Sequence, residues 1–149
     1  MNVPESIRWL TLGEADLSRL RAAVTGALAA RPSIAAAYLY GSVARGRPAR
    51  DIDIGLVGDS PSASSVDLAA IANDIAAAMA LPASDLDVRM LNGADPVFLG
   101  NVMRDGQLLF ERDRRARVRF EVHALNQWFD FRPAWERVRS RVLAKWSDG

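Results

Sequence analysis

The amino-acid sequence predicts an α/β (α+β) domain in which helices flank a small mixed sheet. Two kinds of segment alternate along the chain. Apolar residues recur every three or four positions over residues 14–30 and 64–80, which is the period of an amphipathic helix. Other segments are short, apolar or alternating, and typical of strands: residues 34–40, 51–57, 84–91 and 107–110. Helical periodicity returns from residue 112 onward.

Length and composition limit the classes of protein to consider. The chain has 149 residues, 50% of them hydrophobic, which is enough for one domain with a core. It contains no cysteine, so we expect no disulfides and no thiol chemistry, in keeping with a cytoplasmic protein. The single histidine excludes a multi-histidine metal site. We see no signal peptide and no apolar run of membrane-spanning length, and we expect no membrane partner.

These bounds predict one domain over residues 1–149, with a core over about 15–111 and C-terminal helices over 112–147. The first predicted helix ends at Arg31-Pro32, because proline disfavours helical backbone in the residue before it. The strand that follows, residues 34–40, is apolar and ends at a glycine.

The turn after this strand is a candidate anion site. Gly41 allows a tight turn and a close backbone approach, and Ser42 is expected to cap a short helix. A helix that begins directly after a strand presents free N–H groups to an anion. An ordinary strand-to-helix turn is the alternative.

Two carboxylates follow the turn, in the segment Asp51-Ile52-Asp53-Ile54. Side chains two positions apart on a strand project from the same face, so we expect Asp51 and Asp53 side by side. Close carboxylates repel each other, and a cation between them relieves that repulsion. Carboxylate oxygens suit Mg²⁺, which often completes its shell with substrate phosphates. The alternative is a solvated strand with two surface acids.

Further along, Ser64 is expected to cap the helix that ends near residue 80. The strand over 84–91 places its polar side chains on one face: Asp85, Asp87 and Arg89. Asp95-Pro96 then opens a short helix.

The C-terminal region differs from the rest of the chain in charge. It has 10 basic and 6 acidic residues over 111–149, against 9 and 12 over 1–110. We expect Pro133 to break this region into two helices with one apolar stripe each. The stripes are Val118, Val122, Leu125 and Phe129, then Trp135, Val138, Val142 and Trp146. The aromatic residues around the break are either core or a protein-binding surface, and the positive charge either faces an acidic partner or is solvated.

The turn and the carboxylates together resemble a known signature. The sequence Gly41-Ser42-x-Ala44-Arg45-Gly46, followed by Asp51-Ile52-Asp53-Ile54, is similar to the motif of polymerase-β-type nucleotidyltransferases. Within that superfamily it most resembles the minimal nucleotidyltransferase (MNT) group, which includes the MntA-like antitoxins of HEPN-domain toxins. The loop before the first aspartate is shorter here than is usual in that family, and Arg50 occupies a position where the family has serine.

The resemblance implies a polymerase-β-like nucleotidyltransferase fold and roles for the carboxylates. Asp51 and Asp53 would be catalytic residues that hold one or two Mg²⁺ ions, and Asp87 on a later strand would complete the metal site. A third acid can also assist in deprotonating an attacking hydroxyl. Asp85 is the rival candidate for this position, and an exposed ion pair between Asp87 and Arg89 is the alternative to a metal role.

The resemblance also implies a substrate and a partner. Gly41 and Ser42 would bind the β- and γ-phosphates of ATP, and Arg45 would be a further nucleotide-binding residue. AMP would pass to a protein acceptor, a tyrosine of a cognate HEPN-type toxin in a hetero-oligomer, and direct nucleic-acid binding is not expected. Two other functions remain open: an antitoxin that acts by binding alone, and a small-molecule (antibiotic) nucleotidyltransferase.

Overall fold

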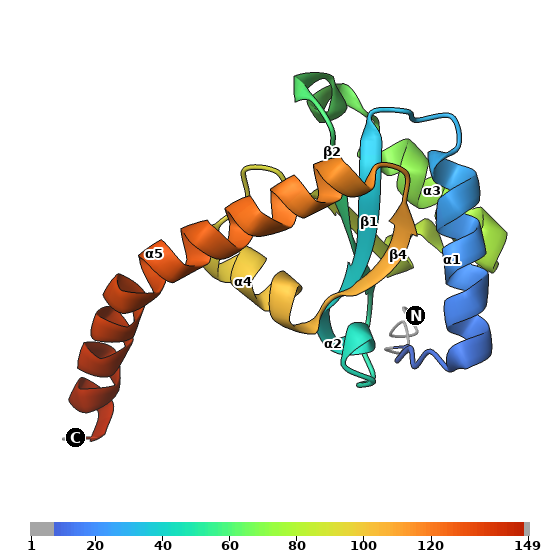
Figure 1. Cartoon of the computed structure of the whole chain (residues 1–149). Helices are drawn as coiled ribbons and strands as arrows, with labels where there is room; N and C mark the ends of the chain where they lie inside the picture. The colour runs from blue at the N-terminus through green and yellow to red at the C-terminus, as the bar shows by residue number, and fades with distance from the viewer. Residues whose placement is uncertain (1–7, 148–149) are drawn as a thin grey trace.

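The computed structural model describes residues 8–147 and has a four-stranded sheet at its centre (Figure 1). The main elements in chain order are α1 (Glu14–Leu28), β1 (Ile34–Tyr40), α2 (Gly41–Ala44), β2 (Ile52–Gly58), α3 (Leu68–Met79), β3 (Leu86–Met90), α4 (Pro96–Asp105), β4 (Gln107–Glu111) and α5 (Arg114–Ser147). Short 3-10 turns precede α3 and β3. This order matches the sequence prediction except at the C-terminus, where one helix replaces the expected two.

The sheet is mixed, with the strand order β3-β2-β1-β4. β1 pairs antiparallel with both β2 and β4, whereas β2 pairs parallel with β3. The predicted fold class is therefore confirmed. The register pairs Tyr40 with Asp53 and Asp53 with Asp87, so residues from three neighbouring strands lie side by side at one end of the sheet.

Helices cover both faces of the sheet. α1 and α3 pack on one face, and α4 with the first half of α5 packs on the other (Figure 1). Side chains alternate along β1, so Ala37 and Leu39 join the α1–α3 core while Tyr38 and Tyr40 join the α4–α5 core. Every residue of β1 is buried as a result.

Aspartates cap the helices that follow β2 and β3. The N–H of Ala70 donates to Asp67 Oδ1 at 3.0 Å in α3, and the N–H of Val97 donates to Asp95 Oδ1 at 2.9 Å in α4. The prediction that Ser64 caps α3 is wrong, since Ser64 lies in the 3-10 turn Pro61–Ser65. Serine and aspartate are both good caps, and here Asp67 caps the helix instead of Ser64.

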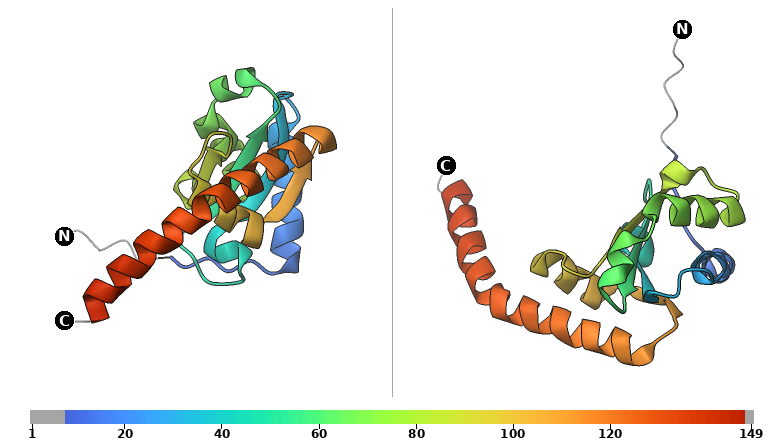
Figure 2. Two further views of the ribbon diagram at one scale, coloured as in Figure 1. Left: turned by 60° about the vertical axis from the view of Figure 1, so that its left-hand side comes forward. Right: turned by 90° about the horizontal axis from the view of Figure 1, so that it is seen from above.

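α5 is continuous from Arg114 to Ser147 although it contains Pro133. The predicted break is therefore wrong. The helix bends instead, and its second half leaves the rest of the molecule (Figure 2). Within residues 8–147, no helix combines the length and the apolar character that crossing a membrane requires.

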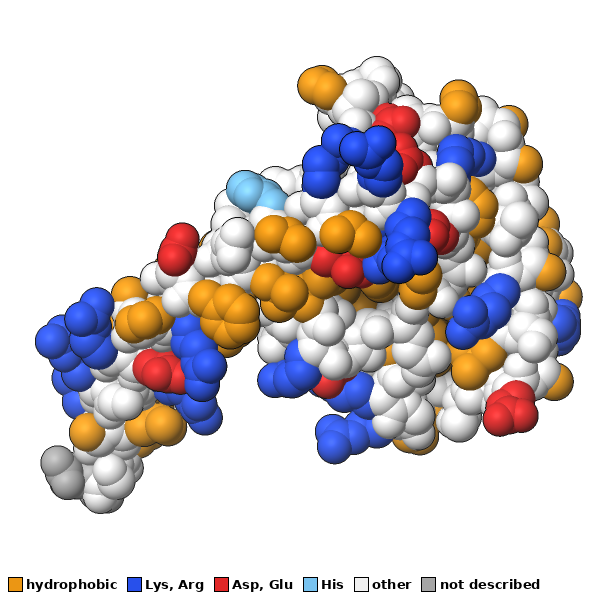
Figure 3. All heavy atoms as spheres, viewed as in Figure 1, with side chains coloured by type: hydrophobic (Ala, Val, Ile, Leu, Met, Phe, Trp, Pro, Cys, Tyr) orange, Lys and Arg blue, Asp and Glu red, His pale blue; other side chains and the backbone are white. Residues whose placement is uncertain are grey.

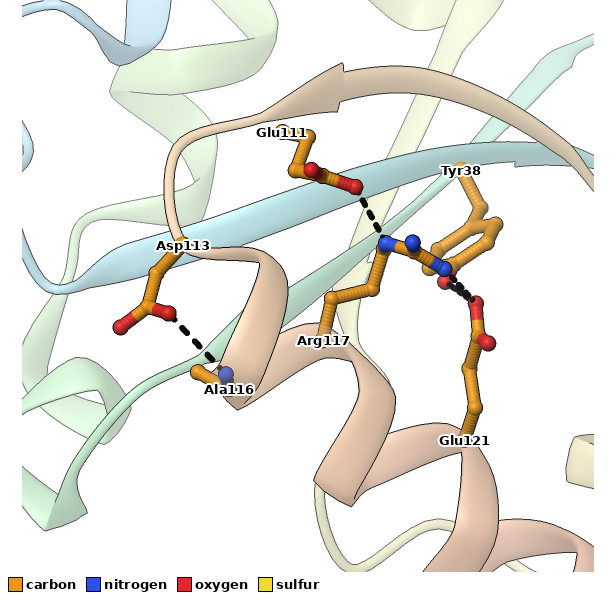
Figure 4. A network of polar contacts seen from close by, with 6 residues as sticks. All are labelled: Tyr38, Glu111, Asp113, Ala116, Arg117 and Glu121. Carbon is orange, nitrogen blue, oxygen red and sulfur yellow. Dashed lines mark hydrogen bonds and ion pairs between the residues drawn. The ribbon is translucent and has the colours of Figure 1, made fainter.

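A polar network joins the first half of α5 to the sheet (Figure 4). Arg117 Nη1 donates to Glu121 Oε1 at 2.7 Å, and Arg117 Nε donates to Glu111 of β4. The Tyr38 hydroxyl of β1 donates to the same Glu121 carboxylate. Asp113 accepts a backbone N–H of the first turn of α5 at 3.1 Å. These contacts fix the start of α5 to two strands.

Candidate active site

The candidate site lies where β1 ends and β2 and β3 begin, next to α2 (Figure 1). α2 begins at Gly41 without a side-chain cap, and Ser42, the predicted cap, is its second residue and half-buried. β2 begins at Ile52, so Asp51 precedes the strand and is exposed, whereas Asp53 is half-buried on it. The structure thus places the turn and both carboxylates at one end of the sheet.

Gly41 holds the turn against the Asp53 carboxylate. Its φ of +74° lies in the left-handed region that favours glycine. A Cβ atom at this position would be 2.3 Å from Asp53 Oδ2, which is closer than any real contact of this kind. Only glycine therefore lets the candidate phosphate-binding turn and the carboxylate touch.

Asp53 is electrostatically coupled to the other predicted carboxylates. Burial raises the pKa of Asp53 to about 6, with the neighbouring Asp87 and Asp51 carboxylates as further causes, against the opposing effect of Arg89. A carboxylate that is costly to ionise among other acids gains from a nearby cation. The arrangement is therefore one that a metal ion would stabilise.

Asp87 is engaged by a cation from its own strand. Arg89 Nη2 is 2.7 Å from Asp87 Oδ2, and the Arg89 guanidinium lies over the Phe98 ring of α4 at 5.5 Å from its centroid. The exposed ion pair considered from the sequence is thus present. Within residues 8–147, no three acidic or histidine side chains converge in a way that holds a metal ion. Asp85, the rival third acid, lies in the turn before β3, and among these residues its buried Oδ2 has no hydrogen-bond partner.

The chemistry of the three predicted carboxylates nevertheless suits Mg²⁺. Asp53 and Asp87 are partners in the register of two adjoining strands, and Asp51 adjoins the start of β2. All three supply hard carboxylate oxygens, which magnesium prefers. The raised pKa of Asp53, caused first by burial and then by Asp87 and Asp51, shows that ionising this carboxyl is costly, and a bound cation would offset that cost. For Asp87 to bind the metal ion, its ion pair with Arg89 must break.

Arg45 lies at the other end of α2 from Gly41. Its Nη1 is 3.6 Å from Asp105 Oδ2, at the end of α4. Gln107 Nε2 of β4 donates to the Ala44 carbonyl at 2.8 Å and fixes this end of α2. Of the three predicted nucleotide-binding residues, Gly41 touches a predicted carboxylate and Ser42 follows it directly, while Arg45 is engaged by an acid of α4.

The shortened loop between α2 and β2 is anchored to the N-terminal segment. Leu10 and Ala49 form an antiparallel bridge with N···O distances of 2.7 and 3.0 Å. The Arg50 guanidinium lies over the Trp9 ring at 5.8 Å from its centroid. The loop thus has its own support, although it differs from the usual family pattern.

Tyr40 is a site residue that the sequence analysis missed. It is buried, lies beside Asp53 in the register and packs edge-on against Phe98 at 5.2 Å. Within residues 8–147 its hydroxyl has no hydrogen-bond partner, and burial, partly opposed by Arg89, raises the pKa of Tyr40 to about 12. The signal in the sequence was its place directly before Gly41, two residues after Tyr38 on the same face of β1.

Comparison with known proteins agrees with this geometry. Residues 23–115 match the model of the polymerase beta nucleotidyltransferase family. No curated protein sequence matches the chain. One solved structure of similar fold is an MNT antitoxin from a complex with a tri-AMPylated HEPN toxin of Shewanella oneidensis. It is 20% identical, the match covers 85% of this chain and 98% of that one, and the TM-score is 0.64.

Two further structures share the fold. One is from a toxin–antitoxin complex with AMP-PNP, with 22% identity, coverage of 83% and 98%, and a TM-score of 0.64. The other is from an MntA toxin–antitoxin complex in which two aspartates are replaced by glutamate, with 20% identity, coverage of 83% and 98%, and a TM-score of 0.65. The family match spans more than half of the sequence, including the Gly-Ser turn and all three predicted carboxylates. The chain therefore belongs to the polymerase-β-type nucleotidyltransferase family.

Proposed function

We propose that this protein is a Mg²⁺-dependent protein adenylyltransferase that transfers AMP from ATP to a tyrosine of a cognate HEPN-type toxin and thereby acts as its antitoxin. The observation that carries the proposal is the contact of Gly41 with Asp53, in register with Asp87. It brings a candidate phosphate-binding turn and a carboxylate pair together, which phosphoryl-type transfer requires.

The similar structures support the choice of substrate and acceptor. They include a complex with AMP-PNP and a tri-AMPylated HEPN toxin bound to its MNT antitoxin. The replacement of two aspartates in another such complex is consistent with a role for paired carboxylates there. We carry these features over to the present chain as part of the proposal.

Some of the site residues would bind the metal and others the phosphates. Asp51, Asp53 and Asp87 would hold Mg²⁺, which when bound neutralises charge on the triphosphate and on the oxygens of the displacement. Gly41 and Ser42 bind the β- and γ-phosphates through the open turn. These residues orient the α-phosphorus for attack in line with the leaving oxygen.

The transfer conserves atoms and charge. The acceptor tyrosine oxygen forms a bond to the α-phosphorus, the bond from that phosphorus to the bridging oxygen of the β-phosphate breaks, and pyrophosphate leaves. A carboxylate of the site takes the hydroxyl proton, and we assign this to Asp87, since its side chain is partly open to solvent.

One observation favours a second function, that of an antitoxin that acts by binding alone. Arg89 already neutralises Asp87 in this structure, and the two are 2.7 Å apart. If that ion pair persists in the presence of metal and nucleotide, the third carboxylate is not available for catalysis.

The test is transfer of label from ATP labelled at its α-phosphate, with Mg²⁺ and a HEPN-type toxin, co-expressed with this chain, as acceptor. Label should reach that protein with the wild-type chain and be lost with Asp51→Ala and with Asp53→Ala. Asp59→Ala, which removes an exposed acid beyond the far end of β2, is the control and should retain transfer. Inhibition of the toxin without label would establish the binding function instead, and label on an added aminoglycoside alone would establish a small-molecule transferase.

A further inference from the structure

One face of α5 is buried in the first half of the helix. Ala116, Phe120 and Ala124 recur at intervals of four and belong to the buried residues on the α4–α5 side of the sheet. Trp128, four residues further on, packs against Gly100 of α4, where an added Cβ would lie 2.7 Å from the indole ring. This face is therefore the side of α5 that the domain covers.

The same face continues, uncovered, beyond Pro133. After Trp128, large apolar side chains follow at intervals of three and four: Phe131, Trp135, Val138, Val142 and Trp146. Their exposed fractions run from 37% at Trp135 to 81% at Trp146. We call residues 131–147 the arm. Within residues 8–147 none of these five side chains is buried, although they continue the spacing of the residues that are buried in the first half of α5.

The figures show why the stripe loses its cover. From above, α5 follows the sheet and then bends away at its middle, so that the arm projects from the domain (Figure 2). In the space-filling view, hydrophobic side chains extend along α5 onto the arm, where lysine and arginine side chains surround them (Figure 3). Soluble proteins rarely expose a contiguous apolar surface without a use for it.

The charged residues beside the apolar stripe indicate which kind of partner can bind to it. The arm has five basic residues and one acidic residue: Arg132, Arg137, Arg139, Arg141 and Lys145 against Glu136. Glu136 pairs with Arg132 at 2.8 Å. Arg139 follows Val138 and Lys145 precedes Trp146, so cations adjoin the apolar positions. Two arms packed together would bring like charges face to face, which disfavours a second copy of this chain.

We propose that the apolar face of the arm is the docking site for an acidic helix of the protein that accepts AMP. Apolar spacing of three and four predicts a helical occupant, and flanking cations predict acidic residues beside its own apolar stripe. The inference rests on the proposed function for the identity of this partner. α4 connects the two sites, because Gly100 contacts Trp128 at the base of the arm while Phe98 contacts Tyr40 beside Asp53.

The experiment measures the affinity of the whole 149-residue chain for the same HEPN-type toxin by isothermal titration calorimetry. The test variant carries Val138→Glu and Val142→Glu, which place acids in the stripe. The control is Ser140→Glu, an exposed position between them on the opposite side of the helix. Both positions in the test variant are exposed, so thermal unfolding should match the wild type.

We expect the dissociation constant of the test variant to rise about 30-fold or more, the effect of losing an interface hot spot, and that of Ser140→Glu to stay near wild type. Added salt should weaken wild-type binding. Unchanged binding by the test variant, or no binding by the wild type, overturns the docking site. So does a wild-type dimer, seen by light scattering, that the test variant abolishes. If binding depends on the arm but no label is transferred, the docking site stands and the adenylyltransferase proposal fails.

Discussion

Gly41 is the tightest point of the candidate site, because its φ is +74° and an added methyl group would lie 2.3 Å from Asp53 Oδ2. We predict that Gly41→Ala lowers the free energy of unfolding by about 1–2 kcal/mol for the left-handed backbone and displaces the carboxylate, which abolishes label transfer. Gly46 has a φ of +70° with no atom near an added Cβ, so Gly46→Ala should show the backbone cost but keep transfer. Equal transfer by both variants, with stability measured by urea unfolding, would contradict a role for this contact.

Asp53 makes the stability of the metal-free protein depend on pH. Its pKa is raised to about 6 from the ordinary value of 3.8, so its ionisation destabilises the fold, and the cost appears as the pH rises through about 6. Asp53→Asn should therefore be more stable than wild type at pH 7.5 by about 1–2 kcal/mol, allowing for partial exposure, and no more stable below pH 4.

The measurement for Asp53 is thermal unfolding in EDTA across this pH range, with Asp59→Asn as the control at an exposed position. Mg²⁺ should reduce the difference in stability between Asp53→Asn and the wild type at pH 7.5, because a bound cation stabilises the wild-type carboxylate. If the wild type is at least as stable as Asp53→Asn at pH 7.5 in EDTA, ionisation of Asp53 does not destabilise the fold.

At this scale the sequence was informative about charge and poor about packing. The spacing of Asp51 and Asp53 and the glycine before them could be recognised, because strand periodicity and turn chemistry are local. The packing of Tyr40 against Phe98 could not, since it depends on α4, which comes more than 50 residues later. The ion pair of Asp87 with Arg89 was foreseeable from their spacing on one strand face.

Among the elements, α4 as well as the sheet holds α5 in place. The Trp128 ring occupies the space that a side chain at Gly100 would need, at 2.7 Å from the nearest ring atom. Gly100→Ala should gain helix propensity but overpack this contact, with a net loss of about 1–2 kcal/mol in the free energy of unfolding.

Gly26 of α1 provides the matched control for Gly100. It is an exposed helical glycine with no atom near an added Cβ, so Gly26→Ala should raise the free energy of unfolding by about 0.5–1 kcal/mol. Urea unfolding of both variants checks the pair. Stabilisation of similar size at both positions would show that the Trp128 side chain moves to make room and that the contact between α4 and α5 is not tightly packed.

The errors of the sequence analysis at this scale have a common cause. The break at Pro133 and the cap at Ser64 rest on local preferences. A proline inside a helix can be accommodated by a bend rather than by an end, and Asp67 offers a second good cap three residues after Ser64. The stripe that begins at Val118 is exposed, whereas Ala116 and Ala124 are buried. Small residues face the sheet because α5 lies close to it, and hydrophobicity alone does not reveal that.

For the whole molecule, the sequence predicted the mixed sheet and the order of its elements, because each strand and helix has a clear period. It did not predict the strand order β3-β2-β1-β4 from residues alone; the resemblance to a family supplied the fold. The excess of basic residues over 111–149 can be counted from the sequence, but only the structure separates the part of α5 that packs on the sheet from the part that projects.

That division of one helix between core and arm has a consequence for how the arm meets a partner. A segment as short as the arm forms a helix poorly on its own in water, because the first turn of a helix is entropically costly to nucleate. Here the first half of α5, fixed to the sheet by Arg117 and Phe120, provides that nucleus, and the arm only has to propagate from it. The arm is thus preorganised, and a binding partner does not have to meet the entropic cost of folding a disordered segment.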